Sequence, residues 1–124
     1  MQLAGIHRQL IEARQALVES SDRARAGEPD PAYRLALRSR NLLFHATRGL
    51  AAARGQDLPE MPVVAGKPGT LEDASAALSA LDAALALFPE PDHAALDQAL
   101  AAARVPYVAW LGFLREEVGK TLRR

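Results

Sequence analysis

Apolar residues recur at helical spacing in four stretches of the chain, a pattern that predicts four amphipathic helices. The first stretch runs from about residue 2 to 26, and Ile11 and Val18 widen its apolar stripe. The stripe itself consists of Leu3, Ile6, Leu10, Ala13 and Leu17. The second stretch lies between Asp30 and Gly55. Its apolar face is formed by Leu35, Leu42, Ala46, Leu50 and Ala53.

Two further stripes follow in the second half of the chain. The third stripe consists of Leu71, Ala74, Leu78, Leu81, Leu85 and Phe88. The fourth begins after Asp92, which is expected to cap a helix, and consists of Leu96, Leu100, Ala103, Tyr107, Leu111, Leu114, Val118 and Leu122. This stripe keeps its phase across Pro106, which predicts one continuous helix kinked at the proline. Trp110 lies on the same face, so we expect it to be buried.

Capping residues predict where the helices begin and end. Asp30 is expected to cap the second helix, with Pro31 at the first position, where a missing N–H costs nothing. Gly55 is expected to end that helix. Thr70 and Asp73 have the spacing of a capping box at the start of the third helix.

Two connections set the predicted topology. The short one, residues 27–30, folds the second helix back antiparallel to the first. The long one, residues 56–69, holds three prolines and two glycines and, when extended, spans about 45 Å, so the direction of the third helix stays open. We predict an all-α fold, an antiparallel four-helix bundle. It forms a single domain over residues 1–124, with a long Pro/Gly-rich connector between helices 2 and 3 and a proline-kinked helix 4.

Composition excludes several classes of site. The 124 residues are 49% hydrophobic, enough for a real core, and none is cysteine, which excludes disulfides, thiolate metal sites and a cysteine nucleophile. No apolar run has the length of a membrane span, and the N-terminus lacks a targeting pattern. We therefore expect a cytoplasmic protein with no membrane partner.

The zero net charge hides an asymmetry along the chain. Residues 1–56 carry a net charge of +4, residues 57–97 carry −7, and residues 98–124 carry +3. Pairing between the acidic segment and the basic ones within the molecule is the simplest explanation.

A row of polar residues lies about half a turn from the apolar stripe of the second helix. It consists of Arg34, Arg38, Asn41, His45 and Arg48, and no acidic residue occurs between Asp30 and Asp57. Guanidinium groups fork onto phosphate oxygens, so the row is a candidate site for a nucleotide or RNA, and a solvated helix face is the alternative. Arg40 points to the other side, where a half-buried arginine is expected to have a carboxylate partner.

The same helix carries a family resemblance. Arg40, Asn41 and His45 match the short arginine, polar, histidine motif of HEPN-domain ribonucleases, and residues 41–55 resemble the second helix of HEPN proteins. The resemblance covers residues 1–56 and implies dimerisation and a nucleotidyltransferase-like protein partner. In the family the motif lies on a late helix, whereas residues 94–124 contain no histidine. No ribonuclease site is therefore carried over, and we assign no catalytic residue.

His7, His45 and His93 are the only imidazoles and could in principle hold a metal ion. In a plain up-down bundle His93 lies at the opposite end from the other two. If the connector crosses the bundle, all three lie at one end, a topology that resembles the DinB-like metal-binding bundles, although their helical HxxxH pair is absent. We expect no bound metal and no cofactor, and keep a DinB-like enzyme as an alternative.

A second apolar face lies opposite the core stripe of the fourth helix. It consists of Ala101, Val105, Val108, Gly112 and Gly119, and the third helix repeats the pattern with Ala76, Ala80, Ala83 and Leu87. We predict a two-fold homodimer through these faces, with Arg104 and Arg115 at its rim. The alternative is that the connector covers this face through Leu58, Met61, Val63 and Val64.

The chain contains no nucleophile elbow, no glycine-rich phosphate loop and no zinc protease motif. We therefore interpret it as a helical binding or interaction module rather than an enzyme. A purely structural homodimer is the remaining alternative.

Overall fold

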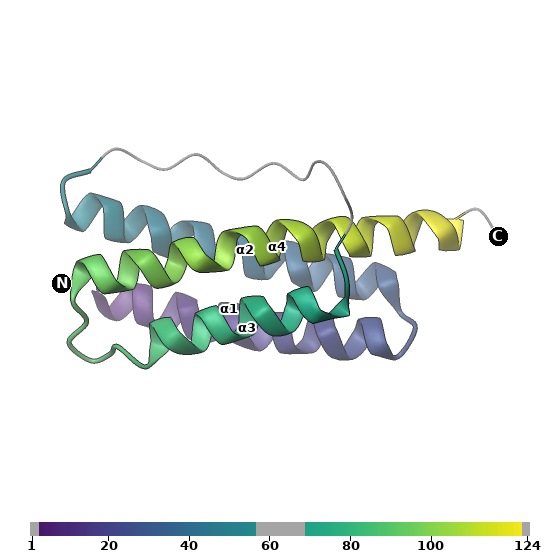
Figure 1. Cartoon of the computed structure of the whole chain (residues 1–124), viewed down its shortest axis with the longest axis horizontal. Coiled ribbons are helices and arrows are strands. Elements are labelled where there is room, and N and C mark those ends of the chain that lie inside the picture. Colours follow the sequence, from purple (N-terminus) through teal and green to yellow (C-terminus); the bar gives the residue numbers. More distant parts are fainter. Residues whose placement is uncertain (1–2, 57–68, 123–124) are drawn as a thin grey trace.

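The computed structural model describes residues 3–56 and 69–122, which form four helices and no strand (Figure 1). These are α1 (Leu3–Arg25), α2 (Pro29–Ala53), α3 (Leu71–Leu85) and α4 (His93–Leu122). The prediction of an all-α four-helix bundle is confirmed. In the described part of the chain, no helix is both long and apolar enough to cross a membrane.

Contacts between helices settle the direction of α3, which the sequence left open. Helix α1 packs against α2 and α3, and α4 packs against the same two helices. Arg14 pairs with Asp82 while His7 stacks on Phe88, so α3 runs antiparallel to α1. Helices α2 and α3 therefore run in the same direction at opposite corners of the bundle, and every neighbouring pair is antiparallel (Figure 1).

The core face of α1 agrees with the predicted stripe, since Ile6, Leu10, Ala13 and Leu17 are buried. The prediction that Ile11 widens the apolar stripe is wrong, since this residue lies on the outer side of the helix and is 47% exposed.

The core face of α2 is rotated from the predicted one. Leu35 and Leu42 are only half-buried, and Ala53 is exposed. The buried residues are Ala32, Ala36, Ser39, Leu43, Ala46, Thr47, Leu50 and Ala51. Small side chains dominate this face and let the helix axes approach closely. Ser39 and Thr47 are tolerated because each donates a hydrogen bond, to Ala13 O (2.6 Å) and Leu43 O (2.8 Å) respectively.

In α3 only Ala74 and Leu81 of the predicted stripe are buried, whereas Leu71, Leu78, Leu85 and Phe88 are half-buried. Ala77 and Ala84 complete the buried face of α3. The stripe of α4 is confirmed over most of its length, since it is buried from Leu96 to Leu114. Leu122 is 80% exposed, so the stripe ends before the helix does. Figure 1 shows the last turns of α4 extending past the α1–α2 turn.

Helix ends follow the capping signals with one exception. Thr70 and Asp73 form the expected capping box, and Asp92 Oδ2 accepts a hydrogen bond from Ala95 N at 3.1 Å. Asp30 does not cap α2: the helix begins at Pro29, so Asp30 falls inside the first turn. Gly55 has φ +68° just beyond α2, where a left-handed residue is expected. Helix α4 continues without a break across Pro106.

Two hydrogen-bond relays tie α4 to α1 and α2 in the core. Tyr107 OH lies 2.5 Å from Ser39 Oγ; since Ser39 donates its own hydrogen to Ala13 O, Tyr107 is the donor. Trp110 Nε1 donates to Ser20 Oγ at 3.1 Å, and Ser20 donates to Ala32 O at 2.7 Å. Each relay joins three helices and leaves no buried hydroxyl in it unpaired, so the relays define the register of the bundle.

Charge matching within the molecule is seen between the segments that carry opposite charge. Arg14 Nε lies 2.5 Å from Asp82 Oδ1, and Arg54 Nη1 lies 3.5 Å from Asp97 Oδ2. Both pairs are partly exposed, so each contributes about 0–1 kcal/mol and mainly favours this arrangement of helices over others.

Candidate functional site

The basic row of α2 is exposed along its whole length, as predicted. Arg34, Arg38, Asn41, His45 and Arg48 all face solvent. The tertiary structure nevertheless divides the row into two halves with different electrostatic surroundings.

Carboxylates lie near both arginines of the N-terminal half of the row, although among the described residues only Arg34 forms an ion pair. Arg34 Nη2 lies 2.9 Å from Asp30 Oδ2, one turn earlier on α2. Arg38 lines a shallow groove of about 160 Å³ together with Glu12 and Glu19 of α1. An anionic ligand at this half would have to compete with these acidic side chains.

The C-terminal half is different, because Arg48 lies over the ring of Phe44, with its guanidinium carbon 5.6 Å from the ring centroid. The His45 ring lies 6.4 Å from the same phenyl ring. No carboxylate within residues 3–56 or 69–122 forms an ion pair with Arg48 or His45. The contact of Phe44 with Arg48 was not among the predictions, although their spacing of four residues on α2 is the local signal for it.

Arg40 does not join this group. It is half-buried, and its Nε is shielded from solvent without a hydrogen-bond partner among the described residues. The expected carboxylate partner is not found there. His45 is exposed, and residues five apart on a helix point about 140° apart, so the arginine and the histidine of the short motif lie on different sides of α2.

The three histidines lie toward one end of the bundle, because the parallel course of α2 and α3 brings the start of α4 beside the end of α2. Of the two placements considered for His93, the one at the same end as His7 and His45 is therefore found, and the one for a plain up-down bundle is not. His7 is stacked on Phe88, with ring centroids 4.4 Å apart and an interplanar angle of 11°. Within the described ranges, no three His, Asp or Glu side chains are close enough to hold a metal ion.

The predicted dimer face of α4 is only partly open. Ala101 and Val105 are exposed, Val105 by 78%, while Val108, Gly112 and Gly119 are half-buried. Gly69 lies against this helix, and its N–H donates to Ala109 O at 3.2 Å. The alternative prediction is that the connector covers this face through Leu58, Met61, Val63 and Val64. These four residues lie outside the described part of the chain.

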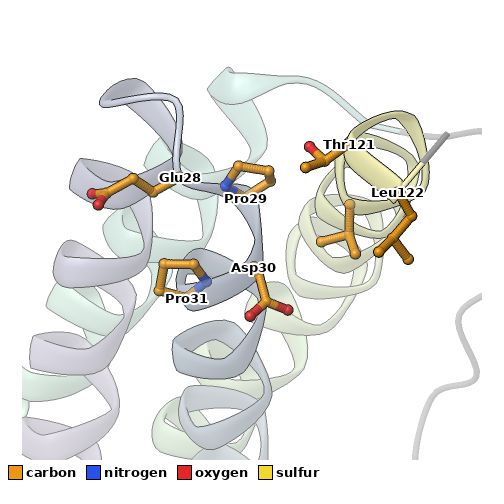
Figure 2. Close-up of a pocket in the computed structure, with 7 residues that line it drawn as sticks. Glu28, Pro29, Asp30, Pro31, Thr121 and Leu122 are labelled. Atoms are coloured by element: carbon orange, nitrogen blue, oxygen red, sulfur yellow. The ribbon is translucent and has the colours of Figure 1, made fainter. Parts of the chain in front are cut away.

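A cleft of about 340 Å³ separates the first turn of α2 from the last turns of α4 (Figure 2). Its lining residues are Glu28, Pro29, Asp30, Pro31, Val118, Thr121 and Leu122. The polar groups at the cleft already have partners: Glu28 pairs with Arg23, Asp30 pairs with Arg34, and Thr121 donates to Glu117 O. The cleft therefore offers mainly apolar contact. No local pattern signals it, because its two walls come from segments far apart in the sequence.

Comparison with known proteins returns no match among family models, curated proteins or solved structures.

Proposed function

We propose that the chain is a helical binding module that engages an anionic partner, a nucleotide or RNA, through Arg48 and His45 on α2. The observation that carries the proposal is the position of Arg48. Its guanidinium lies over Phe44 and, in the described part of the chain, forms no ion pair. An arginine held on a ring loses less side-chain entropy when it binds phosphate than a mobile one does.

Phe44 supports the site by positioning Arg48. Because the guanidinium lies over the half-buried ring, the phenyl group holds the charge at the surface. Charge supports the same assignment. Arg34 pairs with Asp30, and Arg38 shares a groove with Glu12 and Glu19. Among the described residues, no carboxylate pairs with Arg48 or His45. The proposed site is therefore the C-terminal half of the basic row.

The HEPN resemblance of residues 1–56 agrees with a binding role and adds a nucleotidyltransferase-like protein to the proposed partners. We propose no ribonuclease step, because Arg40 and His45 lie on different sides of α2 and only His45 is exposed.

Binding of a fluorescein-labelled single-stranded oligoribonucleotide, followed by anisotropy as the salt concentration is raised, tests the proposal. We expect affinity to fall steeply with salt, and Arg48→Gln to weaken binding several-fold and to reduce the log–log salt slope by about 0.7. The matched control is Arg34→Gln, which removes an arginine of the same helix that already pairs with Asp30.

Two results would overturn the proposal: no binding at low salt, or a flat response to salt. Equal loss in Arg48→Gln and Arg34→Gln would show attraction by overall charge and would remove the assigned site.

A structural homodimer is the second candidate, and the exposure of Val105 favours it. A β-branched apolar residue that is 78% exposed, beside the small side chain of Ala101, suits a helix–helix contact with a second copy of the chain.

A further inference from the structure

We draw no further inference here: the strongest candidate, the apolar cleft between the first turn of α2 and the last turns of α4, carries none because nothing in the structure shows what covers it.

Discussion

Single residues of α4 do more than fill the core of this bundle. Trp110 is fully buried, stacks on Phe113 at a centroid distance of 5.4 Å, and donates a hydrogen bond to Ser20. Tyr107 is likewise buried and donates a hydrogen bond to Ser39. Both side chains combine a large apolar surface with one satisfied polar atom, so shortening either one removes packing and a hydrogen bond together.

Replacing Trp110 tests this at the residue scale. Trp110→Ala should lower the free energy of unfolding by about 3–5 kcal/mol, because it leaves a cavity and takes the donor away from Ser20 Oγ. Urea unfolding followed by circular dichroism measures the loss. Trp110→Phe, which keeps much of the ring, should cost less than the alanine variant. A loss below about 1 kcal/mol in Trp110→Ala would contradict the burial.

Tyr107 predicts how stability depends on alkaline pH. Burial raises the pKa of its phenol well above the usual value, and the hydrogen bond with Ser39 opposes this only in part. The unfolded chain loses this proton near pH 10 while the folded chain keeps it. The contribution of Tyr107 to the free energy of unfolding is therefore fully present below pH 10 and is lost progressively above it.

We expect this group to contribute a fall of up to about 1.4 kcal/mol per pH unit above pH 10. Urea titrations between pH 8 and about pH 11 measure it, with Tyr107→Phe as the reference because it cannot lose the proton. Parallel curves for the two proteins would show that Tyr107 ionises normally in the folded state.

At the scale of elements, the start of α3 depends on a close approach to α4. Gly69 donates its N–H to Ala109 O, and the capping box of Thr70 and Asp73 begins at the next residue. A Cβ added at Gly69 would lie 2.5 Å from Ala109 O and would also collide with the Asp73 carboxylate. Ala109 O is part of a helix and cannot move away alone.

Gly69→Ala should therefore destabilise the protein by about 1–3 kcal/mol, through overpacking and disturbance of the capping box. Gly5→Ala is the control within α1, because a Cβ there meets nothing within 4 Å, and it should stabilise the protein by up to about 1 kcal/mol. Thermal and urea unfolding of both variants measure the difference. Equal effects at the two positions would rule out the close approach.

At the scale of the whole molecule, α2 and α3 run parallel at opposite corners, and α1 and α4 occupy the other two. This arrangement buries Tyr107 and Trp110 of α4 and joins them to Ser39 of α2 and Ser20 of α1, and it leaves one face of α4 directed outward at Val105. If that face binds a second copy of the chain, the particle mass measured in solution is twice that of one chain.

We expect light scattering at micromolar concentration to give about twice the chain mass of 13.3 kDa, and Val105→Glu to return it to the mass of one chain. Val105 is a better position for this test than the half-buried Gly112, because a charged residue there does not disturb the subunit itself. Ala52→Glu, at an exposed position of α2, is the control. A 13.3 kDa particle for the wild type would exclude the dimer.

The sequence by itself determined the four helices and most of their ends. Thr70 with Asp73, Asp92, Gly55 and the unbroken phase across Pro106 are local signals, read within one or two turns of helix. The burial of Trp110 could also be predicted from the sequence, because a large apolar residue on a long apolar stripe is expected to face the core.

Only the tertiary structure decided the direction of α3, the core face of α2 and the surroundings of each arginine. Ser39 lies in the core because Ala13 O and Tyr107 meet it there, and neither partner is near it in sequence. Arg38 lines a groove with Glu12 and Glu19 of α1 whereas Arg48 lies over Phe44, although the two arginines look equivalent along α2. Helical periodicity reports only which residues share a face, whereas burial and charge pairing depend on the helix that packs against it.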